Sequence, residues 1–127
     1  MPALVFDHIH LRSPDPEATA IWFEEMLGAE IIRSMQQGKP RVDMRLGGAE
    51  IFIIPSAATA AGPPAAPHLG IDHFGFSVTG IDAYAAALKA KGVTFTMEPT
   101  TPRPGIRICF IRGPENISIE ILERFPV

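Results

Sequence analysis

The chain has 127 residues, with 14 acidic against 11 basic side chains and a formal net charge of −3. This length suits one domain, and the negative charge argues against a nucleic-acid partner, which usually meets a basic patch. No apolar run approaches the ~18 residues of a membrane-spanning helix. Cys109 is the only cysteine, which excludes an intrachain disulfide, and the N-terminal residues lack the pattern of a signal peptide. We therefore expect a cytoplasmic protein with no membrane partner.

The first half of the chain predicts a strand, a helix and three more strands. Residues 4–11 are rich in β-branched and aromatic side chains and short enough to form a strand. Ser13 or Asp15 can cap the helix that follows, Pro16 suits its first position, and Gly28 suits its end. The three later strands are expected over residues 29–35, 41–46 and 49–54. The last two are joined by two glycines, which favours a hairpin.

The second half repeats this order. A strand is expected over 71–78, and apolar residues at helical spacing predict a helix over 81–88 that ends near Gly92. Three more strands are expected over residues 93–99, 106–112 and 116–122. The spacing between two Asp-His dipeptides, at His8 and His73, nearly equals the spacing between the two helix-ending glycines. Because one such unit cannot bury its apolar face alone, two copies are expected to fold together.

A stretch rich in proline and alanine, residues 55–70, separates the two copies. Proline stiffens this stretch, and it carries no helix or strand pattern. We interpret the chain as a single domain, with a first module at about 1–55, a linker at 56–69 and a second module at about 70–127. His68, in the linker, is expected in solvent.

Two histidines and one glutamate are candidate metal ligands. His8 and His73 each follow an aspartate in a predicted strand, in the sequences FDHIHL and IDHFGF, and Glu120 lies in the last predicted strand. Two histidines and a carboxylate form the ligand set of many mononuclear Fe(II) enzymes, and strands can hold such a set rigidly. We predict a metal site at these three residues. The alternative is that the histidines pack in the core or at an edge, and that the glutamate is a surface acid.

With these residues in this order, essentially the whole chain resembles the vicinal oxygen chelate superfamily. That superfamily includes glyoxalase I, the bleomycin-resistance proteins, the fosfomycin-resistance transferases and the extradiol dioxygenases. The resemblance implies an α+β fold, in which two βαβββ modules form a pair of curved mixed-sheet half-barrels around a metal cavity. It also implies a small-molecule substrate, a homodimer and a divalent metal. Fe(II) is favoured, Mn(II) comes next, and Zn or Ni is possible.

A fourth ligand position separates the activities within this superfamily. Glyoxalase I has a glutamate in the last strand of its first module, and this chain has Phe52 at the matching position, which cannot bind a metal. Glu50 lies two residues earlier on the same face of the predicted strand. It reaches the cavity only if that strand is shifted by two residues; otherwise it is solvated at the strand end.

Further residues are expected to line the cavity beside the metal. His10 and Arg12 share the face of His8 if the strand is regular. His10 is a candidate general acid/base because its ordinary pKa lies near neutrality; a packing role is the alternative. Arg12 matches a position where glyoxalase I has an arginine that binds a carboxylate, and a plain surface arginine is the alternative. The candidate substrate-binding residues are Arg12, Arg41, Glu50 and Phe52.

These observations predict a mononuclear divalent-metal enzyme of dioxygenase type. Its substrate is expected to be small and to chelate the metal through two adjacent oxygens, because three protein ligands leave open coordination positions. One alternative is a glyoxalase-like lyase or isomerase, which requires Glu50 as a fourth ligand with Zn or Ni. The other alternative is a protein that binds a drug or metabolite without catalysis, as the bleomycin-resistance proteins do.

Overall fold

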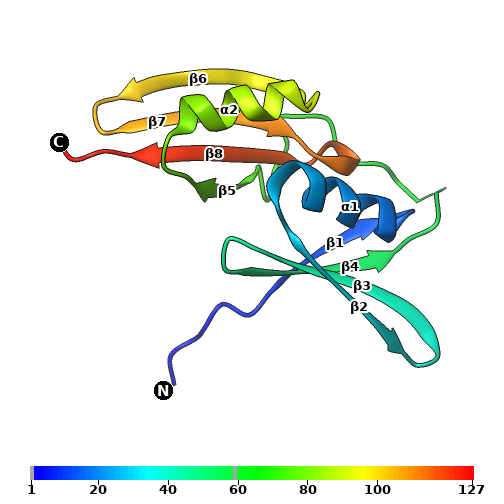
Figure 1. Cartoon of the computed structure of the whole chain (residues 1–127). Helices are drawn as coiled ribbons and strands as arrows, with labels where there is room; N and C mark the ends of the chain where they lie inside the picture. The colour runs from blue at the N-terminus through cyan, green and yellow to red at the C-terminus, as the bar shows by residue number, and fades with distance from the viewer. Residues whose placement is uncertain (1, 59) are drawn as a thin grey trace. The chain divides into compact units, whose positions relative to one another are not determined.

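The computed structural model describes residues 2–58 and 60–127 and divides the chain into two compact units, Met1–Ala61 and Gly62–Val127. Each unit contains one α-helix and one four-stranded mixed sheet, and each sheet is open (Figure 1). The predicted α+β fold of two similar modules is therefore confirmed. Neither helix in the described residues is long and apolar enough to cross a membrane.

The first unit has the predicted order of strand, helix and three strands. Its elements are β1 (Ile9–Ser13), α1 (Pro16–Leu27), β2 (Glu30–Gln36), β3 (Lys39–Leu46) and β4 (Ala49–Pro55). The strand order in the sheet is β1-β4-β3-β2, with β1 parallel to β4 and the other pairs antiparallel. The parallel pair requires a crossover, which α1 and the β2–β3 hairpin provide.

Local sequence explains where α1 begins and ends. The Asp15 side chain accepts a hydrogen bond from the backbone N–H of Ala18 at 3.1 Å, and proline occupies the first turn. Gly28 ends the helix with φ at +78°, a left-handed conformation that glycine adopts without strain. The buried Ser13 hydroxyl lies 2.7 Å from that of Thr19, which joins the end of β1 to the helix.

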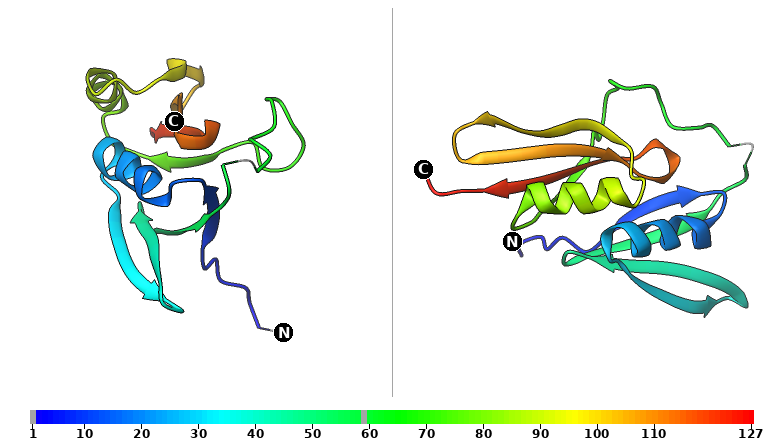
Figure 2. Two further views of the ribbon diagram at one scale, coloured as in Figure 1. Left: turned by 90° about the vertical axis from the view of Figure 1, so that its right-hand side faces the viewer. Right: turned by 45° about the horizontal axis from the view of Figure 1, so that its top comes forward.

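Because side chains alternate along the strands, one face of this sheet is buried against the helix and the other carries polar and aromatic side chains. α1 packs on the face that carries Met44 and Ile51, and the Phe23 side chain of the helix is fully buried there. The opposite face carries His10, Phe52 and other polar or aromatic side chains. Figure 2 shows α1 lying along one side of the sheet, so the helix does not cover the other face.

The second unit repeats this architecture. Its elements are β5 (Phe74–Ser77), α2 (Ile81–Ala90), β6 (Phe95–Arg103), β7 (Ile106–Arg112), a 3₁₀ turn (Pro114–Asn116) and β8 (Ser118–Arg124), with the sheet order β5-β8-β7-β6. The Glu123 carboxylate accepts hydrogen bonds from the backbone N–H groups of Gly80 and Ile81, both at 3.0 Å, and so caps α2. Buried Ile119 and Ile121 face this helix, so Ser118 and Glu120 lie on the other face of β8.

Both module-opening strands are shorter than predicted. The strand expected over 4–11 is Ile9–Ser13, and the strand expected over 71–78 is Phe74–Ser77. Leu4 and Phe6 are instead 98% and 76% exposed. A strand needs a ladder partner, and β4 and β8 supply one only to the residues from Ile9 and Phe74 onward. Local composition cannot show where that partner begins.

The structure also differs from the sequence predictions for the strand at 93–99 and for His68. The strand expected over 93–99 runs from Phe95 to Arg103, because an edge strand tolerates the register irregularities and prolines of this segment. His68, which was expected in solvent, is half-buried, and its Nδ1 lies 3.0 Å from the backbone oxygen of Leu69.

Candidate metal centre

His73 and Glu120 form a direct pair in the second unit. His73 lies immediately before β5, and Glu120 lies on β8, opposite Gly75 in the β5–β8 ladder. The imidazole Nε2 is 3.1 Å from Glu120 Oε1, and the imidazole Nδ1 is 2.7 Å from Asp72 Oδ2. The side chains of His73 and Glu120 are 30% and 18% exposed, so both remain accessible to a small ligand.

Gly75 lies directly beside the glutamate. A Cβ atom at Gly75 would lie 3.4 Å from the Cβ and 3.5 Å from Oε1 of Glu120, which is ordinary van der Waals contact. The corresponding position in the first unit is His10, which has a full side chain. The two units therefore differ at this ladder position, where a glycine is the partner of Glu120 and a histidine is the partner of Phe52.

The two neighbouring carboxylates affect the ionisation of His73. The hydrogen bond with Asp72 is the main cause that raises the pKa of His73, and the hydrogen bond with Glu120 adds to it, while desolvation works against both. The same contact with His73 lowers the pKa of Asp72. The metal-free pair therefore favours a protonated imidazole between two carboxylates.

This arrangement offers two of the donor atoms that a divalent metal ion would need. A metal-binding histidine commonly donates one ring N–H to a carboxylate, which fixes the ring orientation and leaves the other nitrogen for the metal. Asp72 is placed to accept from Nδ1, and Nε2 is directed toward Glu120. When the imidazole is neutral, His73 Nε2 and a Glu120 oxygen are the two atoms that can hold the metal.

The first unit has the matching histidine without the matching carboxylate. His8 lies immediately before β1, and its Nδ1 is 2.7 Å from Asp7 Oδ2. Phe52 is the ladder partner of His10, as Glu120 is the ladder partner of Gly75, so Phe52 is the structural counterpart of Glu120. The rings of His8 and Phe52 are stacked, with centroids 4.3 Å apart. An aromatic contact thus replaces the carboxylate contact.

Asp43 is a further carboxylate on this face that the sequence reasoning missed. It is the ladder partner of Phe52 on β3, just as Phe110 is the partner of Glu120 on β7. Each module therefore has an acid and a phenylalanine as partners on neighbouring strands. In the first unit the acid is on β3 and the phenylalanine on β4, whereas in the second unit the phenylalanine is on β7 and the acid on β8. Arg41 Nε donates to Asp43 Oδ2 at 2.8 Å, whereas Oδ1 is buried with no hydrogen-bond partner in the described residues. The alternation of RVDMRL placed Asp43 on the polar face and was the available signal.

Three of the predicted substrate-binding and catalytic residues lie close to Phe52 or near the end of β1. The His10 ring is 5.0 Å from the His8 ring and 5.3 Å from the Phe52 ring. The Arg41 guanidinium lies 4.9 Å from the centroid of Phe52. Arg12 Nη1 donates to Ser56 Oγ at 3.3 Å. The first unit thus combines two histidines, an aromatic ring and an arginine–aspartate pair on one face.

Glu50 does not occupy the position that a fourth ligand requires. Its partner in the regular β3–β4 ladder is Arg45, and its Oε1 accepts from Arg45 Nε at 2.7 Å. The two-residue strand shift that would bring Glu50 to the site is absent. Charge pairing across the hairpin explains where this side chain lies.

The structure brings together two of the three predicted ligands. His73 and Glu120 belong to the second unit and His8 to the first, and the described residues contain no group of three histidine, cysteine or acidic side chains placed to hold a metal ion. The three-ligand set stays a prediction. The expectation that strands supply all three is wrong for the histidines, because each lies one residue before its strand. Buried Cys109 is no substitute, since desolvation raises its pKa to about 11.

Comparisons with known proteins agree with the repeated architecture. The sequence profile of the Glyoxalase/Bleomycin resistance protein/Dioxygenase superfamily matches residues 5–121. The chain belongs to this superfamily. A search of curated proteins found no match to the chain.

Solved structures of other proteins have the same fold. A glyoxylase/bleomycin resistance protein/dioxygenase domain from Frankia sp. EAN1pec is 22% identical, with a TM-score of 0.76 over 98% of this chain and 100% of that chain. A glyoxalase family protein from Bacillus cereus is also 22% identical, with a TM-score of 0.76 over 99% of this chain and 97% of that chain. TioX from Micromonospora sp. ML1 is 18% identical, with a TM-score of 0.70 over 97% and 98% of the two chains. At these identities the likeness shows the fold alone.

Proposed function

We propose that this superfamily member is a mononuclear divalent-metal enzyme of dioxygenase type, acting on a small substrate that chelates through adjacent oxygens. The observation that carries the proposal is the His73–Glu120 contact at 3.1 Å, with Asp72 holding the other ring nitrogen. His8, whose Nδ1 is held in the same way by Asp7, is proposed as the third ligand. Fe(II) is the favoured metal and Mn(II) the next, because the set of two histidines and one carboxylate suits them.

The proposed chemistry divides between the metal and the chain. A bound divalent metal would act as a Lewis acid and would offer open positions for two substrate oxygens and a co-substrate. Asp72 orients His73, and Glu120 supplies the negative charge that partly neutralises the cation. His10, beside His8 and Phe52, is proposed to accept or return a substrate proton.

The proposal is tested by loading the full-length protein with Fe(II) under anaerobic conditions and adding catechol. We expect retained iron after desalting and a spectral change with catechol, because a chelating diol occupies open positions next to each other. Exposure to oxygen should then consume the diol. Iron that is lost on desalting, together with an unchanged spectrum, would overturn the proposal.

A binding protein without catalysis is the second candidate. The observation that favours it is the stacking of Phe52 on His8, since this contact makes the first unit a better surface for a flat ligand than for a cation. In that case the protein would bind planar ligands equally well with and without added metal. A glyoxalase-like isomerase is less favoured because Glu50 is paired with Arg45. Robust isomerisation of the methylglyoxal–glutathione adduct, abolished by Glu50→Gln, would restore that alternative.

We also propose that the protein is a homodimer. Taken by itself, each sheet is open, with β1 and β2 or β5 and β6 at its edges, and exposed edges are commonly covered by another element or chain. Light scattering should give a mass near twice that of the 13.7 kDa chain. A mass near one chain at all working concentrations would contradict this prediction.

A further inference from the structure

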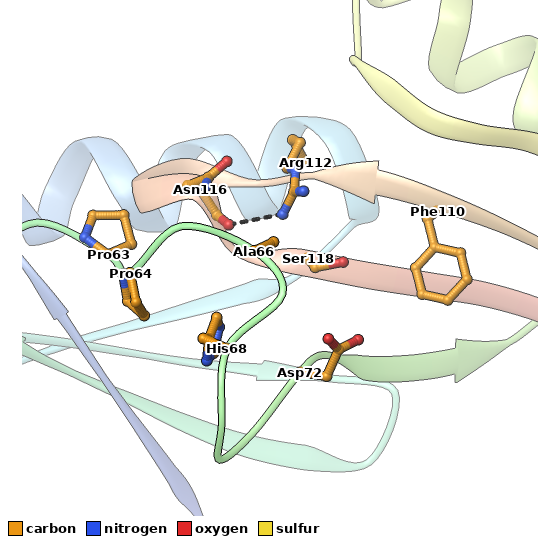
Figure 3. Close-up of a pocket in the computed structure, with 9 residues that line it drawn as sticks. All are labelled: Pro63, Pro64, Ala66, His68, Asp72, Phe110, Arg112, Asn116 and Ser118. Atoms are coloured by element: carbon orange, nitrogen blue, oxygen red, sulfur yellow. Dashed lines mark hydrogen bonds between the residues drawn. The ribbon is translucent and has the colours of Figure 1, made fainter.

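A small pocket lies in the second unit and is lined in part by residues of β7 and β8 (Figure 3). It has a volume of about 150 Å³, and a cavity of ~150 Å³ can hold a benzene ring. Pro63, Pro64 and His68 line it from the segment before β5, and Phe110, Arg112 and Ser118 line it from the sheet. The pocket thus combines apolar ring surfaces with a cation and a hydroxyl group.

Arg112 gives this pocket a cationic wall that forms no salt bridge in the described part of the chain. Its Nη1 donates to the backbone oxygen of Asn116 at 3.2 Å. Four other arginines each meet a carboxylate, namely Arg33, Arg41, Arg45 and Arg107. Asp72 also lines the pocket; its carboxylate contacts His73, and Arg112 acts on it only through a weaker Coulombic attraction. The remaining donors of Arg112 are therefore available to an anion from outside the chain.

The sheet register places this cation at a defined spacing from the metal-ligand pair. Arg112 is opposite Ser118 in the β7–β8 ladder, and Phe110 is opposite Glu120. Each pair is two residues from the other, so they lie ~7 Å apart on one face. The Phe110 ring also meets the His73 ring edge-on, with centroids 4.8 Å apart. One substituted aromatic ring is long enough to reach from Arg112 to the His73–Glu120 pair.

We propose that this pocket binds the carboxylate of a small, flat aromatic acid, with Arg112 as the anion-binding residue. Arg112 binds the carboxylate through its N–H groups, the Ser118 hydroxyl donates a further hydrogen bond, and Phe110 and the prolines contact the ring. The opposite end of the acid carries the adjacent oxygens and lies at His73 and Glu120. The identity of that oxygen-bearing end rests on the proposed function, whereas the carboxylate end rests on the pocket itself.

The carboxylate end is tested on the metal-free, full-length protein with benzoate as the probe and benzamide as its neutral counterpart. Both are titrated at constant ionic strength and followed by amide chemical shifts in NMR. We expect benzoate to bind at least about tenfold more tightly than benzamide, because a charged hydrogen bond contributes roughly 1.5–3 kcal/mol. Arg112→Met should remove that difference, and Arg124→Met, at an exposed arginine of the same unit, should preserve it. Equal benzoate affinity in wild type and Arg112→Met would overturn the proposal.

Ser118→Ala keeps the proposal testable if Arg112→Met folds poorly. It leaves the Arg112–Asn116 contact in place and should weaken benzoate binding by roughly 2- to 10-fold, the range for loss of one neutral hydrogen bond. Unchanged benzoate affinity in this variant would contradict the assigned role of the hydroxyl group and of this pocket.

A second titration separates this inference from the proposed function. On the Fe(II)-loaded protein, 3,4-dihydroxybenzoate should bind at least about tenfold more tightly than catechol, and Arg112→Met should abolish the advantage. If benzoate binds the metal-free protein through Arg112 but neither diol changes the iron spectrum, the pocket stands and the proposed function fails. If catechol changes the spectrum but benzoate affinity does not depend on Arg112, the function stands and the pocket inference fails.

Discussion

Glu120→Gln is expected to weaken divalent-metal binding by roughly 100-fold or more, because loss of a direct ligand should exceed the 10- to 100-fold cost typical of losing a residue that only orients a ligand. Glutamine keeps the size of the side chain and one oxygen, but it removes the negative charge beside His73 Nε2. Metal affinity is measured by titration with Fe(II) under anaerobic conditions, and with Mn(II) in air. The expected result is nearly complete loss of bound metal after desalting.

Glu115→Gln is the matched control for this change. Glu115 is an exposed glutamate of the same unit, in the turn before β8, and its substitution changes the net charge by the same amount. Its metal affinity should equal that of wild type. Equal metal binding in wild type and Glu120→Gln would remove Glu120 from the ligand set.

The pH dependence of metal binding follows from the pKa of His73. Asp72 is the main cause that raises this pKa above 6.5, so protons compete with the metal at higher pH than for an ordinary histidine. Metal affinity should fall as the pH drops through the raised pKa. In Asp72→Asn the imidazole loses its main proton-stabilising contact, so the fall should move to lower pH.

The metal-free protein should show the opposite trend in stability. A folded-state pKa above the unfolded value means that the folded state holds its proton more tightly. The stabilisation from His73 is then fully present below the unfolded pKa and is lost as the pH rises through the folded pKa. Thermal unfolding at several pH values, with and without metal, measures both trends. The size of the effect is reduced by solvent, because the side chain is 30% exposed.

Phe23→Ala is expected to lower the free energy of unfolding by about 3–5 kcal/mol, the usual cost of truncating a fully buried phenylalanine. The Phe23 side chain is 0% exposed, and its helix packs on the sheet face that carries Met44 and Ile51. Alanine at this position leaves a cavity that the strands cannot fill. Urea denaturation followed by circular dichroism measures the change.

Phe6→Ala provides the comparison, because the same truncation is made at a side chain that is 76% exposed. Its free energy of unfolding should stay within about 0.5 kcal/mol of wild type, as expected for a surface change. A cost below about 1 kcal/mol for Phe23→Ala would mean that α1 does not cover the sheet as described.

The sequence predicted the candidate site in part. The repeat placed His8 and His73 at equivalent positions, and the resemblance to known proteins identified Phe52 as the counterpart of Glu120. Ladder register supports that correspondence, since the two residues face equivalent partners on β1 and β5. Asp43 was missed because its importance depends on lying opposite Phe52, and cross-strand pairing cannot be read from one strand alone.

The sequence by itself determined the features that arise from local chemistry. Asp15, Pro16 and Gly28 set the ends of α1 because a cap, a fixed φ and a left-handed residue act on their immediate neighbours. Alternating apolar residues determined which face of each sheet is buried. Only the tertiary structure decided where β1 and β5 begin, that Glu50 pairs with Arg45, and that the Arg112–Ser118 pair lies two residues along the ladder from the Phe110–Glu120 pair. The starts of β1 and β5 depend on partner strands that lie far along the chain, and the two hairpin pairings depend on a register that composition does not specify.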